Sequence, residues 1–137
     1  MDINDARDFV RKHHQAVLAT RRKDGRPQLS PVSVTVDPEG RVTISSREHA
    51  YKVRNLRRDP HVSLCVLPDG FYGGPWVQID GTAEVVSQPE ALELLVEYYR
   101  SISGEHPDWD EYREAMVQQE RVLVRITIER AGPDRAA

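Results

Sequence analysis

The chain has 137 residues, and its 19 basic and 22 acidic side chains give it a formal net charge of −3. This length suits one domain with a hydrophobic core, and the charge excludes a general attraction to nucleic acid or to an anionic membrane. The single cysteine, Cys65, excludes an internal disulfide framework. With no apolar stretch long enough for a signal peptide or a membrane span, we expect a cytoplasmic protein with no membrane partner.

In chain order, the sequence predicts a short N-terminal helix that carries Phe9 and Val10, and then six strands. Apolar alternation and β-branched residues place the strands within residues 16–20, 32–36, 41–45, 61–67, 77–85 and 122–128. The turn sequences "KDGRP" and "DPEG" separate the first three strands. We therefore expect those three strands to form a consecutive antiparallel meander.

Two helices are predicted between the fifth and sixth strands. Ser87 and Glu90 have the spacing of a capping box, and Asp108 and Glu111 repeat it. Apolar residues then recur at helical spacing, first at Leu92, Leu95, Val96 and Tyr99 and later at Trp109, Tyr112 and Met116. Strands with few crossovers and peripheral helices favour a small antiparallel barrel. We expect one domain over residues 1–130 and a frayed tail over residues 131–137.

A basic stretch, "SSREHAYKVRNLRRDP" at residues 45–60, stands out in this acidic chain. Residues 50–58 read as a helix that ends at Asp59-Pro60, with Val53 and Leu56 facing the core. Arg54, Arg57 and Arg58 then fall on the solvated side, whereas Lys52 lies at the margin of the buried stripe, beside the end of the strand with Ser45 and Ser46. The spacing alone fits a phosphate site and a lysine that merely extends into solvent equally well.

Taken together, these segments resemble the pyridoxamine-phosphate-oxidase-like split β-barrels, and among them the actinobacterial branch that uses coenzyme F-420, a 5-deazaflavin. The resemblance is carried by "VLATRRKDGRPQLSPV", "YKVRNLRRDP", "DGTAEV" and "YRSISGEHPDWDEYREAMV". It implies a mainly β (α+β) fold, an antiparallel six-stranded split β-barrel with peripheral helices. It also implies a homodimer with its two sites at the subunit interface.

The resemblance further implies which residues bind the cofactor. The phosphate group would lie at Ser45, Ser46 and Lys52, with Arg54 and Asn55 nearby. The ring would lie against the second strand, at Gln28, Ser30, Pro31, Val32 and Ser33, and Trp76 of the second chain would cover it. A regular helix turns Arg54 away from Lys52, so the helical wheel and the resemblance differ on that residue.

The function implied is hydride transfer from reduced F-420 to an unsaturated small-molecule acceptor. Such chemistry is carried by the cofactor, so the chain needs neither a catalytic nucleophile nor a metal. One alternative is an FMN-dependent oxidase or reductase of the pyridoxamine-phosphate-oxidase type. Another is a non-catalytic barrel that binds the deazaflavin or haem.

Overall fold

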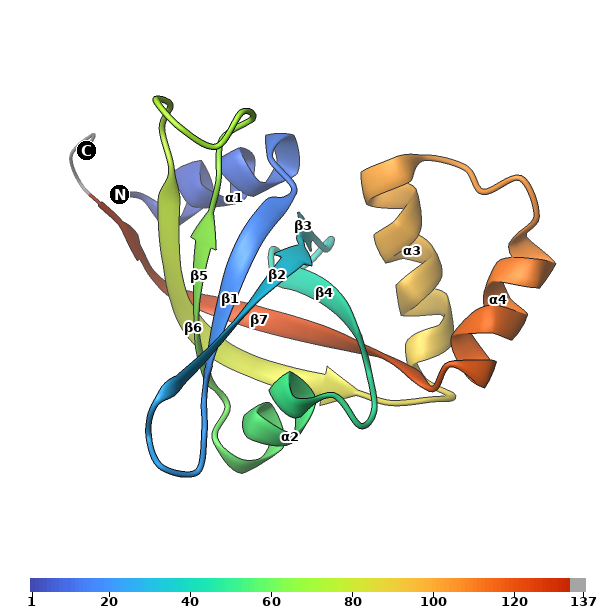
Figure 1. Ribbon diagram of the computed structural model, residues 1–137. Coiled ribbons are helices and arrows are strands. Elements are labelled where there is room, and N and C mark those ends of the chain that lie inside the picture. The colour runs from blue at the N-terminus through green and yellow to red at the C-terminus, as the bar shows by residue number, and fades with distance from the viewer. Residues whose placement is uncertain (134–137) are drawn as a thin grey trace.

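The computed structural model describes residues 1–133, which form four helices and seven strands (Figure 1). The helices are α1 (Ile3–Lys12), α2 (Tyr51–Arg58), α3 (Ala91–Ser103) and α4 (Trp109–Gln118). The strands are β1 (Gln15–Arg21), β2 (Pro27–Ser33), β3 (Thr35–Val36), β4 (Val42–Arg47), β5 (His61–Val66), β6 (Val77–Val86) and β7 (Arg121–Gly132). None of the helices in residues 1–133 is long and apolar enough to span a membrane.

All strand pairs are antiparallel, and the sheet has the order β2-β1-β5-β6-β7-β4-β3. The long strands curl into a half-open barrel (Figure 1), which confirms the predicted antiparallel split barrel with peripheral helices. The predicted meander is wrong. The β1–β2 and β3–β4 hairpins both form, but they lie at opposite ends of the sheet order, so β2 is not hydrogen-bonded to β3 or β4.

The seventh strand arises because the predicted strand at residues 32–36 is broken at Val34. Val34 is fully buried, and its backbone N–H donates to the His14 carbonyl at 2.8 Å, which extends the β1–β2 pairing by one residue before Thr35 pairs with β4. Thr35, expected on a polar face, is only 3% exposed and shares a hydrogen bond with Ser101 of α3. Tertiary contacts at this junction therefore override the simple alternation.

The barrel core is built from alternate residues of the strands. On β7 the inward residues are those predicted, Val122, Val124, Ile126 and Ile128, and all four are buried. The strand continues to Gly132, and Ala131 packs into the core, so order extends beyond the expected boundary at residue 130. The rest of the expected tail, residues 134–137, lies outside the described residues.

The helices cover different parts of the barrel. α1 packs near β3, β6 and β7, α2 packs against β1 and β6, and α3 and α4 form a helical hairpin beside β7 (Figure 1). The α3–α4 pair has its own apolar cluster, to which β7 contributes Leu123. Asp108 caps α4 as predicted, by accepting from the Glu111 N–H. The other predicted capping box is wrong, because the Ser87 hydroxyl donates to Glu48 instead.

One glycine in β6 is required by close packing. A bulge interrupts the β6–β7 register between Asp80 and Gly81. A Cβ atom on Gly81 would lie 2.2 Å from the Thr127 carbonyl oxygen, which is closer than such atoms can approach. The bulge therefore brings two backbones together at a spacing that only glycine allows.

Candidate functional site

Helix α2 forms as the sequence predicts and places Lys52 at the margin of the core. Val53 and Leu56 are buried, and the helix ends just before Pro60. Lys52 is half-buried, and it forms no hydrogen bond or ion pair within residues 1–133. Burial lowers the pKa of its ammonium, and the positive charge of Arg121 lowers that pKa further. A nearby anion would relieve both effects.

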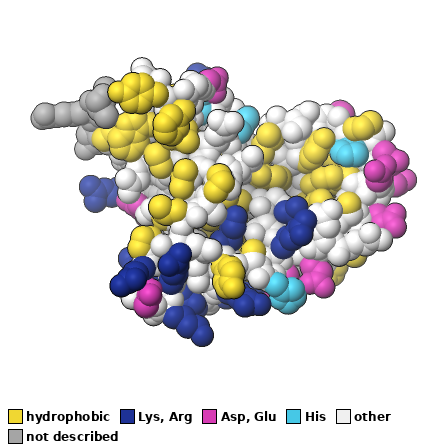
Figure 2. All heavy atoms as spheres, in the orientation of Figure 1, with side chains coloured by type: hydrophobic (Ala, Val, Ile, Leu, Met, Phe, Trp, Pro, Cys, Tyr) yellow, Lys and Arg dark blue, Asp and Glu magenta, His cyan; other side chains and the backbone are white. Residues whose placement is uncertain are grey.

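Two arginines extend this positive charge. Arg47 and Arg121 lie directly opposite each other in the β4–β7 ladder. Burial lowers the pKa of Arg121, as does the charge of Arg47, while Tyr112 and Tyr98 act in the opposite direction. Neither arginine forms an ion pair with a carboxylate in the described part of the chain. Lys52, Arg47 and Arg121, here called the cation cluster, therefore form a candidate anion site. Lys and Arg side chains also gather over the region of α2 and the β1–β2 hairpin (Figure 2).

The two serines of the predicted phosphate site point to opposite faces of β4. Ser46 is 5% exposed and shares the inward face with Ile44, whereas Ser45 is half-buried on the face turned towards α3. Tyr98 of α3 lies beside Ser45. Burial raises the pKa of the Tyr98 hydroxyl, while a hydrogen bond with the Ser45 backbone and the positive charge of Arg121 both act to lower that pKa. Ser45 is thus the serine on the side of the cation cluster.

Asn55 and Arg54 differ in their suitability for a ligand. Asn55 is buried, and its side-chain N–H groups donate to Thr20 Oγ1 at 3.1 Å and to Gln28 Oε1 at 3.0 Å. Through these hydrogen bonds, Asn55 and Gln28 hold α2 against β1 and β2 and are already partnered within the protein. Arg54 is exposed and stacks on the Tyr51 ring, with 5.9 Å to the ring centroid. It therefore projects away from the core as the helical wheel predicts.

The predicted ring-binding residues lie on an edge strand and divide between its two faces. Gln28, Ser30 and Val32 face inward, since their register partners on β1 are buried. Pro31 and Ser33 face outward. The Ser33 carbonyl accepts a hydrogen bond of 2.7 Å from the Tyr98 hydroxyl, which ties the end of β2 to α3. Pro31, Val32 and Ser33 also line a surface pocket of about 380 Å³ with residues of β1 and Leu67.

Trp76 does not reach β2 within one chain. It directly precedes Val77, the first residue of β6. Across the sheet, Val77 pairs with Val66 of β5, Val66 pairs with Ala16 of β1, and Ala16 pairs with Val32 of β2. Strands β5 and β1 therefore separate Trp76 from the ring-binding strand. The expected role of Trp76 needs a second chain.

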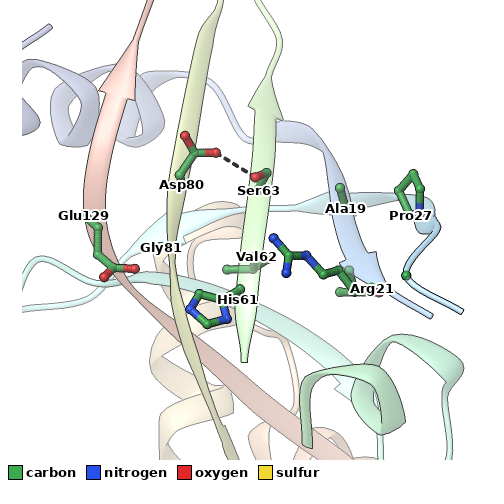
Figure 3. A pocket seen from close by; sticks show the side chains of 11 residues that line it. Ala19, Arg21, Pro27, His61, Val62, Ser63, Asp80, Gly81 and Glu129 are labelled. Carbon is green, nitrogen blue, oxygen red and sulfur yellow. Dashed lines mark hydrogen bonds between the residues drawn. The ribbon is translucent and has the colours of Figure 1, made fainter. Parts of the chain in front are cut away.

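A separate pocket of about 430 Å³ lies over β1, β5 and β6, and its polar side chains do not form a nucleophilic site (Figure 3). The Ser63 hydroxyl donates to Asp80 Oδ1 at 2.6 Å, and His61 Nδ1 lies 2.8 Å from Asp59. Ser63 thus has a carboxylate as its partner and no histidine base among the described residues. The cation cluster remains the stronger candidate.

Arg47 and Arg121 were missed by the sequence reasoning about this site. Arg121 is far from Lys52 in the chain, and only the β4–β7 register brings it next to Arg47. The alternation of the last strand could have indicated that Arg121 and Leu123 share a face, but not which strand lies beside them.

The chain is similar to known proteins over most of its length. Residues 4–133 match the family model described as pyridoxamine 5'-phosphate oxidase. The chain is 27% identical over 128 residues to an F-420-dependent biliverdin reductase of Mycobacterium tuberculosis (strain CDC 1551 / Oshkosh), covering 93% of this chain and 84% of that protein.

Solved structures share the fold. A conserved hypothetical protein of Mycobacterium tuberculosis superposes with a TM-score of 0.78 at 28% identity, covering 100% of this chain and 92% of the other. A structure named F-420 reductase has a TM-score of 0.70 at 20% identity, covering 91% and 94% of the two chains. The second likeness concerns the fold alone.

Proposed function

Because the chain belongs to the pyridoxamine 5'-phosphate oxidase family, we propose that it is an oxidoreductase that binds reduced coenzyme F-420 and uses it to reduce an unsaturated small molecule. The similarity to an F-420-dependent biliverdin reductase supports this choice of cofactor within the family. The observation that carries the proposal is the cation cluster, which has three basic groups and no carboxylate partner in residues 1–133.

The cation cluster fits a phosphate group. Lys52 and Arg121 are both partly desolvated, so each gains from a charge-assisted hydrogen bond to an oxyanion. Ser45 adds a hydroxyl on the same side of β4. A bidentate arginine beside a lysine point charge is a common arrangement for phosphate recognition.

The bound cofactor supplies the hydride, and the chain's residues bind and orient. Lys52, Arg47 and Arg121 would hold the phosphate end, and the β2 edge from Ser30 to Ser33 would contact the ring. Asn55 and Gln28 act indirectly, because their hydrogen bond holds α2 and β2 together. No protein nucleophile is required for this chemistry.

A fluorescence titration of the apo-protein with F-420 tests the proposal. Each charge-assisted hydrogen bond contributes about 1.5–3 kcal/mol, so Lys52→Ala is expected to weaken binding by about tenfold or more. Arg58→Ala is the matched control, because Arg58 is exposed and donates to the Arg21 carbonyl away from the cation cluster. Equal losses in the two variants would contradict the assignment.

FMN is the alternative cofactor, since its phosphate suits the same cation cluster. A parallel titration with FMN, and the colour of the purified protein, separate the two possibilities. Yellow protein with tight FMN binding would favour the oxidase or reductase alternative. Tight binding of F-420 or haem without turnover of any acceptor would favour the non-catalytic barrel.

We also propose that two chains form a homodimer in which Trp76 of one chain covers the ring site of the other. Exposed apolar residues support an interface: Leu29 is 64%, Phe71 72% and Tyr72 90% exposed. Sedimentation equilibrium measures the oligomeric state, and Trp76→Ala is expected to weaken F-420 binding without dissociating the dimer. A monomeric protein with full F-420 affinity would rule this arrangement out.

A further inference from the structure

A groove of about 550 Å³ lies between α3 and the β3–β4 hairpin, and it is lined in part by Tyr98, whose hydroxyl bonds the Ser33 carbonyl. Apolar groups from three elements and the Tyr98 ring line it, namely Val36, Leu94, Tyr98 and Leu123. Its volume lies within the range of pockets that bind small molecules, roughly 300–1,000 Å³. None of the cofactor-binding residues proposed above lines this groove.

The groove contains a hydroxyl without a partner, on a residue that is otherwise buried. Thr43 is only 3% exposed and lines the groove, yet its side chain forms no hydrogen bond within residues 1–133. Its neighbour across the β3–β4 ladder, Thr35, is equally buried but bonds Ser101 Oγ at 3.0 Å. Among residues 1–133 the only fully buried side-chain oxygen or nitrogen without a partner is Gln88 Oε1, so the Thr43 hydroxyl keeps some access to the groove. A ligand that excluded water from the groove would have to supply the hydrogen bond of this hydroxyl.

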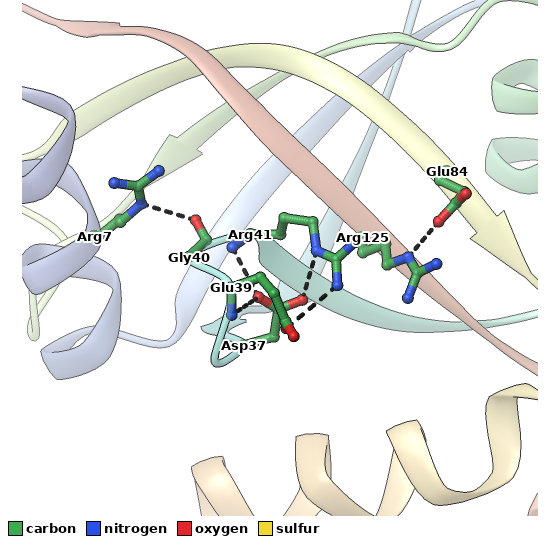
Figure 4. A network of polar contacts seen from close by, with 7 residues as sticks. All are labelled: Arg7, Asp37, Glu39, Gly40, Arg41, Glu84 and Arg125. Atoms are coloured by element: carbon green, nitrogen blue, oxygen red, sulfur yellow. Dashed lines mark hydrogen bonds and ion pairs between the residues drawn. The ribbon is translucent and has the colours of Figure 1, made fainter.

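The charges around the groove are already neutralised. Arg41 bonds both Asp37 and Glu39 (Figure 4), and Arg100 pairs with Glu97 and Glu105. Arg11, at the end of α1, pairs with Asp8. The groove therefore offers a charged ligand no free partner, in contrast to the cation cluster.

We propose that this groove binds a neutral, largely apolar small molecule that presents one carbonyl or hydroxyl oxygen to Thr43. The apolar lining accounts for the body of the ligand, and the single unpartnered hydroxyl accounts for its one polar group. The inference stands independently of the cofactor. It does place the ligand against Tyr98, whose hydroxyl holds the Ser33 carbonyl at the end of β2.

Nile red, a neutral fused-ring dye with one carbonyl, is the probe. Its fluorescence is expected to rise saturably with the full-length protein, with one dye per chain. Thr43→Val keeps the shape and removes the hydroxyl, so it is expected to weaken dye binding about fivefold or more. Circular dichroism melts establish that the variant is folded.

Ser101→Trp fills the groove and is expected to abolish saturable binding. Val117→Ser is the matched control, because Val117 is an exposed apolar residue on α4 outside the groove. Dye affinity unchanged in Thr43→Val, or lowered as much in Val117→Ser, overturns the proposal. If Ser101→Trp does not fold, dye binding to the isosteric Thr43→Val variant still tests the proposal.

Discussion

Arg47 and Arg121 face each other directly across the β4–β7 ladder, although both carry positive charge and neither pairs with a described carboxylate. Like charges directly opposite one another destabilise a ladder. With Lys52 close by, the free protein holds three cations whose mutual repulsion an anion would relieve.

The first prediction concerns the pKa of Lys52. Because the charge of Arg121 lowers this pKa, Arg121→Gln is expected to raise it and to weaken F-420 binding. An NMR titration of lysines labelled at Cε measures the change. Arg125→Gln is the control, since Arg125 lies on the same face of β7 but bonds Glu84. If the Lys52 pKa does not change in Arg121→Gln, the prediction that the charges of Lys52 and Arg121 interact is wrong.

The second prediction is that Lys52→Met stabilises the apo-protein while it impairs cofactor binding. Burial lowers the pKa of Lys52 in the folded state, so the charged form is disfavoured there. The resulting loss of folding stability is complete at pH values below the pKa of Lys52 in the folded protein. It shrinks as the pH rises from that pKa towards 10.5, the ordinary lysine pKa, where Lys52 of the unfolded chain also loses its proton. We expect the Tm at pH 7 to rise by about 2–4 °C, with a smaller gain near pH 10. A lower Tm at pH 7 would mean that Lys52 has a stabilising partner.

The third prediction concerns the link between α2 and β2. Asn55→Ala removes three side-chain hydrogen bonds, two that Asn55 donates and one that it accepts from Arg58, and it leaves Gln28 Oε1 and Thr20 without their buried partner. We expect a loss of about 1–3 kcal/mol in the free energy of unfolding, measured with urea. Gln118→Ala, at an exposed amide on α4, is the control and should change little.

The fourth prediction concerns the bulge in β6. Gly81→Ala places a Cβ atom against the Thr127 carbonyl and is expected to lower the free energy of unfolding by about 3 kcal/mol or more. Gln78→Ala, at an exposed position on the same strand, controls for the loss of β propensity. Equal stability of the two variants would show that β6 and β7 can separate at the bulge without penalty.

Local patterns predicted most of the secondary structure. The alternation in β6 and β7, the end of α2 before Pro60 and the Asp108 cap all depend on residues close in sequence. Ser87 shows where local reasoning fails. It has the spacing of a capping residue, but its hydroxyl donates a hydrogen bond to Glu48, which is 39 residues away in the sequence.

The site was predicted less completely, because it depends on strand order. The helical wheel placed Lys52 at the core margin and Arg54 in solvent, and the structure agrees with both. Arg121 joins Lys52 only through the pairing of β4 with β7, which no local pattern contains. The burial of Asn55 likewise follows from hydrogen bonds to β1 and β2.

The break at Val34 also determines how the two edges of the sheet are connected. β2 and β3 end the sheet on its two sides, yet a single buried residue joins them in the chain. The two edges of the sheet are therefore linked covalently at one end of β2, at residue 34. Towards the other end of β2, Gln28 is held by Asn55, so the two ends of this strand are tied to different parts of the protein, the edge strand β3 and the helix α2.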